Sequence, residues 1–192
     1  MTDKPSSMQY SVAEHYHRDA VDFVGRFDIL WESQTHKTGR IKSFVDLLMS
    51  CECILKSHVF LGHLADNPTD TYILIRKAGH QIALLADEAT FLEDRSGYDF
   101  LKKALNDFSV FIRYSLDAYE AFFPFLSEND EVTLNYSGTI GNNAWVLEVR
   151  QCLAKLLDKS KSQFSGLVTS DIGAIFVHEE EMNRFMKSIR KK

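Results

Sequence analysis

The chain has 192 residues, of which 45% are hydrophobic and 26% are charged, a balance typical of a globular domain with one sizeable core. Nine glycines and three prolines are few for this length, which disfavours a turn-rich all-β fold. The net charge of -5 excludes a general electrostatic attraction to nucleic acid, so an RNA contact would need a local basic patch.

Localisation and metal chemistry are also constrained by the sequence. No apolar run approaches the roughly 18 residues that span a bilayer, and residues 1–7 lack the apolar core of a signal peptide. Three cysteines suit a reducing compartment, so we expect a cytoplasmic protein without a membrane segment. Cys51 and Cys53 lie about 200° apart around a predicted helix and cannot hold one ion together. We predict no metal and no cofactor.

The first two predicted helices follow from apolar residues that recur every three or four positions. One helix is predicted from Val12 to Trp31, and a second from about Arg40 to Leu64. The apolar stripe of the second is wide enough for a central core helix, and it comprises Ile41, Phe44, Leu47, Leu48, Cys51, Ile54, Leu55 and Val59.

Two further helices complete the predicted bundle. The third is expected from about Thr71 to Leu92 and contains Gly79, which costs about 1 kcal/mol relative to alanine inside a helix and so indicates a second backbone close by. The fourth is expected from about Asp99 to Phe123. One side of it carries Leu101, Leu105, Phe108, Ile112, Leu116, Tyr119 and Phe123.

The helix order predicts the architecture. Consecutive helices joined by short loops fold most simply as an antiparallel up-and-down bundle. We therefore predict an all-α fold with a bundle of four to five helices over residues 1–126. Residues 127–192 are predicted to form a polar loop and C-terminal helices, at about 143–160 and 178–189, that pack on the bundle or extend it.

Three short motifs carry a family resemblance. They are the stretch from Glu52 to Lys56 on the second helix, Gly79-His80 on the third, and Arg113-Tyr114 on the fourth. Together with the helical pattern from about Ser11 to Tyr119, they resemble the HEPN domains of bacteria and archaea. The resemblance implies a helical bundle that dimerises. It also implies, for many members, a metal-independent ribonuclease of toxin–antitoxin, CRISPR or antiphage systems.

The catalytic pattern of that family is incomplete in this chain. In active HEPN domains, an arginine on the last bundle helix is followed, after four to six residues, by a histidine, and the two line a cleft at the dimer interface. Arg113 matches the arginine, but Ala118, Tyr119 and Glu120 stand where the histidine belongs. A general acid or base that works near neutral pH is therefore missing from that place. Cleavage of RNA would require Arg113 to act with His80 or Tyr119.

The same residues also have simpler structural interpretations. Arg113 and Asp117 are four apart, the spacing of an ordinary helical ion pair on a solvated stripe. Glu52 and Lys56 have the same spacing and would form a local pair at the edge of the apolar face. His80 would be a histidine at a helix cap or at the edge of the core.

The sequence therefore predicts candidate sites and leaves several functions open. The candidate catalytic residues are Arg113 and His80, and the candidate binding residues are Glu52, Lys56, Arg76, Asp117 and Tyr119. The favoured function is a HEPN-like dimeric module that binds a protein partner or a nucleotide, with a role in stress or phage defence. The alternatives are a toxin-type, metal-independent RNase with a degenerate Arg/His site, and an inert scaffold or antitoxin-like interaction protein.

A homodimer is expected from the aromatic residues of the fourth predicted helix. Related domains pair through their bundle helices, and Phe111, Phe122 and Phe125 lie outside the main apolar stripe of this helix. An isologous pair is the commonest oligomer for such a surface.

Overall fold

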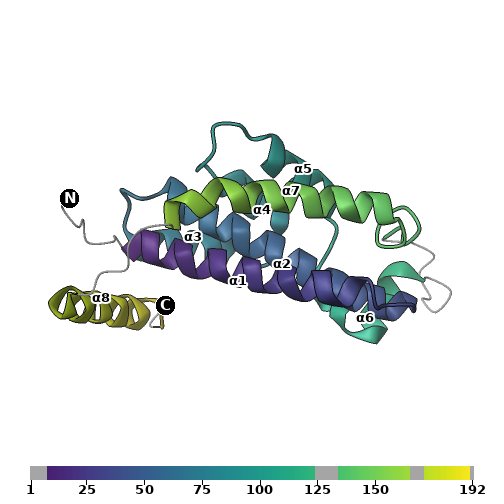
Figure 1. The fold of residues 1–192 in the computed structure, drawn as a ribbon, viewed down its shortest axis with the longest axis horizontal. Helices are drawn as coiled ribbons and strands as arrows, with labels where there is room; N and C mark the ends of the chain where they lie inside the picture. The colour runs from purple at the N-terminus through teal and green to yellow at the C-terminus, as the bar shows by residue number, and fades with distance from the viewer. Residues whose placement is uncertain (1–7, 124–133, 165–170, 191–192) are drawn as a thin grey trace.

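The computed structural model describes residues 8–123, 134–164 and 171–190, and every regular element in these ranges is a helix (Figure 1). This confirms the predicted all-α fold. The α-helices are α1 (Met8–Trp31), α2 (Lys37–Gly62), α3 (Pro68–Ala78), α4 (Ile82–Glu88), α5 (Ser96–Leu105), α6 (Ser115–Phe122), α7 (Asn143–Lys161) and α8 (Ile172–Arg190). Two short 3-10 helices, η1 (Val110–Arg113) and η3 (Ser162–Phe164), precede α6 and follow α7.

Helix α2 is the centre of the bundle. Every position of its predicted apolar stripe is buried, which confirms it as the core helix. Helix α1 lies along it at close range, because the facing residues Ala13 and Ala20 are small and fully buried. At these two points Ser57 donates a hydrogen bond to the Ala13 carbonyl (2.8 Å) and Ser50 donates to the Ala20 carbonyl (2.6 Å). The hydroxyls of Ser50 and Ser57 are thus satisfied within the interface.

Helix α7 belongs to the same core as α1 and α2. Its buried side chains Val149, Leu153 and Leu156 join the one hydrophobic cluster of the described residues. On the surface, the Arg150 guanidinium holds both oxygens of Asp28 in α1, at 2.9 and 2.7 Å. The predicted boundary at residue 126 falls in the stretch 124–133, outside the described residues.

The third predicted helix is interrupted, so its prediction as one continuous helix is wrong. Gly79 ends α3 with a φ of 59°, and its N–H donates to the Ile75 carbonyl (3.0 Å). A positive φ favours glycine, which explains the residue at this cap. The expected close backbone is absent from the described residues, because beyond its own chain neighbours none of them has an atom within 4 Å of the position that a Cβ on Gly79 would occupy.

The fourth predicted helix is interrupted as well, into α5, η1 and α6. Leu101, Leu105, Phe108 and Ile112 are buried as predicted. After them, Tyr114 adopts an extended conformation between η1 and α6, so the helical register is not carried through. Leu116 is consequently 83% exposed and Tyr119 is 40% exposed, instead of lying in the core.

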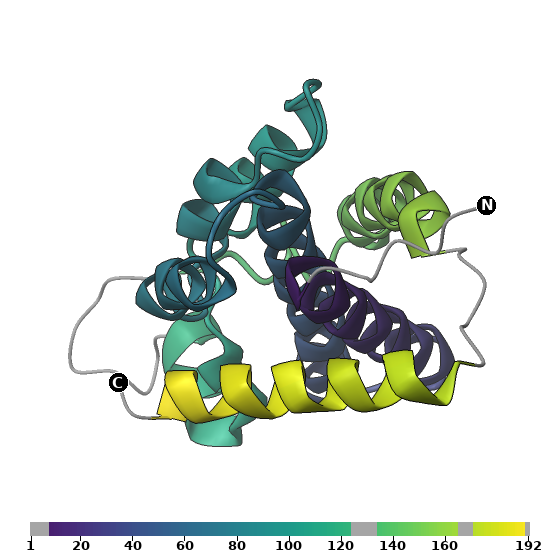
Figure 2. The same ribbon diagram turned by 90° about the vertical axis from the view of Figure 1, so that its left-hand side faces the viewer.

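Helix α8 lies across the bundle, in contact with α1 and α3 (Figure 2). It begins at Ile172, six residues earlier than the predicted start at His178. Only Phe185 and Ile189 are buried among its side chains. Figure 1 shows α8 and α6 toward opposite ends of the long axis of the molecule. In the described part of the chain, no helix combines the length and apolar character needed to cross a membrane.

Candidate functional site

The candidate site is built around a buried carboxylate in the middle of α2. The side chain of Glu52 is 2% exposed, between core residues of the central helix. Removing a carboxylate from water is costly unless charged or hydrogen-bonding groups compensate it. Glu52 therefore indicates that polar partners are held against α2 at this point.

Each oxygen of Glu52 has one cationic or hydrogen-bonding partner. The Lys56 ammonium lies 2.5 Å from Oε1, one helical turn further along α2. The Nδ1 atom of His80 lies 2.9 Å from Oε2. The side chain of Lys56 is 13% exposed and that of His80 is 55% exposed. The sequence predicted Glu52 and Lys56 as a local pair at the edge of the apolar face, whereas the structure buries the Glu52 carboxylate within the core.

The break between α3 and α4 positions His80. Gly79 turns the chain out of α3, and the Gln81 N–H donates to the Ala78 carbonyl (3.1 Å) before α4 begins at Ile82. His80 is thus on a tight turn, where its imidazole reaches back to α2. The positive φ of Gly79 therefore places His80 where its imidazole contacts Glu52.

Tyr16 of α1 closes another side of the cluster. The Lys56 ammonium lies 5.7 Å from the centre of the Tyr16 ring, a cation–π distance. Burial raises the pKa of the Tyr16 phenol, and the neighbouring groups Tyr72, Cys53 and Glu52 raise it further. Tyr16 was not predictable as part of this cluster, because it fits the apolar stripe of α1 and its polar environment comes from other helices.

The cysteines offer no activated nucleophile. Burial is the largest cause that raises the pKa of the Cys53 thiol, to about 12, and the Glu52 carboxylate adds to it. Burial also raises the pKa of Cys152 to about 11 and that of Cys51 still higher. All three side chains are therefore thiols at neutral pH, and thiolate catalysis would need a lowered pKa.

The chemistry available to the cluster is that of an oriented imidazole. A hydrogen bond to the carboxylate places the proton on Nδ1 of His80, which leaves Nε2 as the atom that can accept a proton from a substrate. This is the relation between a general base and its orienting group. A nucleophile and a donor for a developing negative charge would have to come from the substrate or from a second molecule.

Arg113 is not part of this cluster. It ends η1 on the surface, where its guanidinium donates to the Tyr114 hydroxyl (3.0 Å) and lies 4.8 Å from the centre of the same ring. None of the contacts formed by the described residues joins Arg113 to Glu52 or His80. The predicted ion pair with Asp117 is also absent among them, because the extended Tyr114 interrupts the helix between the two residues.

The remaining predicted residues are exposed. Arg76 lies in the last turn of α3, and Asp117 lies in the first turn of α6. Tyr119 packs its ring on Phe123, with 5.7 Å between the ring centres. The structure thus brings Glu52, Lys56 and His80 together and leaves the other predicted residues on separate surfaces.

A group of exposed apolar side chains covers η1 and α6. We call it the η1–α6 surface, and it comprises Phe111 (59% exposed), Tyr114 (52%), Leu116 (83%) and Tyr119 (40%). Of the aromatics expected at a dimer interface, Phe111 belongs to it. Phe122 is buried in the core instead, because the break at Tyr114 turns the opposite side of α6 inward. Phe125 lies outside the described residues.

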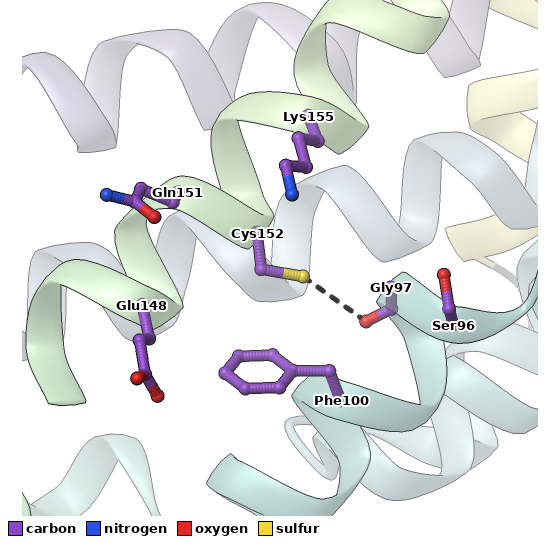
Figure 3. A pocket seen from close by; sticks show the side chains of 7 residues that line it. All are labelled: Ser96, Gly97, Phe100, Glu148, Gln151, Cys152 and Lys155. Carbon is purple, nitrogen blue, oxygen red and sulfur yellow. Dashed lines mark hydrogen bonds between the residues drawn. The ribbon is translucent and has the colours of Figure 1, made fainter.

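A shallow pocket lies between α5 and α7 (Figure 3). The Cys152 thiol donates a hydrogen bond across it to the Gly97 carbonyl (3.4 Å), and Glu148 and Lys155 stand on the α7 side. Nothing in the sequence indicates this pocket. It shares no lining residue with the Glu52 cluster. The described residues also contain no group of three or more His, Cys, Asp or Glu side chains placed to hold a metal ion.

Comparison of the chain with protein-family models, with curated proteins and with solved structures finds no match.

Proposed function

We propose that the chain is a HEPN-like dimeric binding module that acts through the η1–α6 surface. The observation that carries the proposal is the exposure of four large apolar side chains within nine consecutive residues, namely Phe111, Tyr114, Leu116 and Tyr119. Aromatic side chains are enriched at protein interfaces, and adjacent exposed apolar residues mark such sites more often than isolated ones do.

The charges on this segment support a pairing of two copies. Arg113, Asp117 and Glu120 are all exposed in this segment, and among the described residues none of the three forms a salt bridge within its own chain. In an isologous dimer the same surface faces itself, so Arg113 of one copy can meet an acidic residue of the other. The segment is therefore self-complementary in charge as well as apolar.

A protein is the ligand that this surface fits better. The exposed groups are mainly apolar, and the net charge of -5 opposes the phosphates of a nucleotide or an RNA. Stress or phage defence as the setting rests on the family resemblance alone.

Light scattering over a range of micromolar concentrations tests the proposal. The wild-type mass should rise above the 22.0 kDa of one chain as the concentration increases. Leu116→Ser should keep the protein at one chain, because it removes the most exposed apolar side chain of the surface. Leu147→Ser on α7 is the matched control, since Leu147 is also exposed (53%) and should leave the mass as in the wild type. A wild-type mass of 22.0 kDa at every concentration would contradict the proposal.

A second candidate, a metal-independent RNase, is favoured by one observation, the orientation of His80 by the buried Glu52. Its test is cleavage of single-stranded RNA without added metal by the wild type, His80→Ala and Arg113→Ala. The binding-module proposal predicts little or no cleavage by any of the three. Strong wild-type cleavage that both substitutions abolish would establish the enzyme, because groups that act as a unit do not contribute additively.

A further inference from the structure

Helix α8 is attached to the bundle at one end only. Its C-terminal half holds both of its buried side chains, Phe185 and Ile189. Its N-terminal half leaves apolar side chains in the open, namely Ile172 (69% exposed), Ile175 (40%), Phe176 (63%) and Val177 (56%). An amphipathic helix of a globular protein normally buries its apolar side chains against the core. The attachment of α8 is therefore incomplete.

The contacts that hold the C-terminal half are few, and two of them end on α3. The Phe185 ring meets the Tyr72 ring edge to face, with centres 5.9 Å apart, and the hydroxyls of Ser188 and Thr69 lie 2.8 Å apart. Among the described residues, the ion pair of Arg184 and Glu180 stays within α8, and no salt bridge joins this helix to another. The contacts that hold α8 on the bundle are therefore uncharged and lie in its C-terminal half.

Helix α7 provides a comparison within the same molecule. Both helices have 19 residues, but α7 buries Val146, Val149, Leu153 and Leu156 along its length and adds the paired hydrogen bonds of Arg150 to Asp28. Stability within a protein follows the local density of buried apolar contacts, so α8 should open at a lower free energy than α7.

We propose that α8 is a displaceable strap, which leaves α1 and α3 while the rest of the bundle stays folded, and which uncovers Tyr72 when it does so. Release of α8 therefore exposes the face of the Tyr72 ring that Phe185 covers. The inference does not depend on the partner of the η1–α6 surface, because α6 and α8 lie toward opposite ends of the molecule (Figure 1).

Hydrogen exchange of backbone amides in the full chain tests this release. A separated helix of this length is only marginally stable in water, so the amides of α8 exchange whenever it undocks. The amides from Met182 to Arg190 should exchange on the order of tenfold or more faster than those of α7 and α2. Equal exchange rates in the three helices would show that α8 opens only with the whole protein, and would overturn the proposal.

A pair of matched substitutions separates docking from helix stability. Phe185→Ala removes the contact with Tyr72, whereas Phe176→Ala removes an exposed ring from the same helix. Phe185→Ala should speed exchange in α8 severalfold and leave α2 unchanged, and Phe176→Ala should leave both unchanged. Equal effects of the two variants on α8, or acceleration of α2 to the same degree as α8 in Phe185→Ala, would refute the strap.

Nitration by tetranitromethane gives a second readout of the same event. Tyr72 should be nitrated faster in Phe185→Ala than in the wild type, because the covering ring is gone. Tyr98 is fully buried and serves as an internal control for global unfolding. Nitration of Tyr72 and Tyr98 in step would contradict a local release.

Discussion

The buried histidine His58 makes the stability of this protein depend on pH in a predictable way. Its side chain is fully buried in α2, and Nδ1 lies 2.8 Å from the Tyr98 hydroxyl, which in turn accepts a hydrogen bond from the Leu92 N–H (3.3 Å). Burial lowers the pKa of His58 from 6.5 to about 3, and the Leu156 carbonyl opposes this only in part. The imidazole therefore stays neutral in the folded protein.

The magnitude follows from proton linkage. Between pH 6.5 and about 3 the unfolded chain binds one proton at residue 58 that the folded chain does not, so the free energy of unfolding falls by about 1.4 kcal/mol per pH unit as the pH decreases. From pH 7 to pH 5 the loss is about 2 kcal/mol. For a chain of this size that corresponds to a decrease in Tm of about 4–8 °C.

The substitution His58→Gln separates the contribution of His58 to the pH dependence from the contributions of the carboxylates and of His17. Burial lowers the pKa of His17 as well. Glutamine is polar but does not titrate, so urea unfolding followed by circular dichroism should show a smaller loss between pH 7 and pH 5, by about 2 kcal/mol. Tyr98→Phe is the control, because it removes the hydrogen bond but keeps the buried imidazole, and it should retain the wild-type slope. Identical slopes for the wild type and His58→Gln would refute the reasoning.

Three further predictions concern the core and the thiols. Leu55→Ala should lower the free energy of unfolding by about 2–5 kcal/mol, since this side chain is fully buried in α2. A loss under about 0.5 kcal/mol in chemical denaturation would show that the core is assigned wrongly. Gly62→Ala should lower the free energy of unfolding by about 1–3 kcal/mol, because its Cβ would lie 3.0 Å from the Phe91 nitrogen. Gly25→Ala, where the Cβ would meet open space, should instead raise it by about 0.5–1 kcal/mol. Thermal unfolding that ranks the two variants the other way would contradict this. Iodoacetamide should react slowly at pH 7.5, and it should label the half-buried Cys152 before the buried Cys51 and Cys53. Mass spectrometry that finds Cys51 or Cys53 labelled first would contradict this prediction.

The central helix was predictable because its signal is local. Burial on α2 follows directly from the spacing of apolar residues such as Phe44, Leu48 and Leu55, and the structure buries all of them. The same reasoning failed at Gly79, where a glycine inside an apolar pattern was compatible with both close packing and a positive φ. The sequence carried no information to choose between these two causes.

The candidate site was only partly predictable, for a different physical reason. The pairing of Glu52 with His80 joins residues 28 positions apart and depends on the turn after α3, which periodicity does not show. The break at Tyr114 has neither glycine nor proline to mark it. Ser109, whose side chain accepts a hydrogen bond from the Phe111 N–H (3.3 Å), marks the start of η1 but not the break at Tyr114. The break at Tyr114 decides which side chains of α6 face solvent.

The proposal that two copies meet at the η1–α6 surface is tested most directly by a distance between copies. A single spin label at Asp107→Cys, in a Cys152→Ser background, places one probe per chain at an exposed position three residues before η1, while Cys51 and Cys53 stay buried and unlabelled. Isologous pairing brings the two labels around one two-fold axis, so dipolar spectroscopy should give one defined distance, which Leu116→Ser abolishes. A signal without dipolar modulation, or one that Leu116→Ser leaves unchanged, would contradict the dimer through this surface.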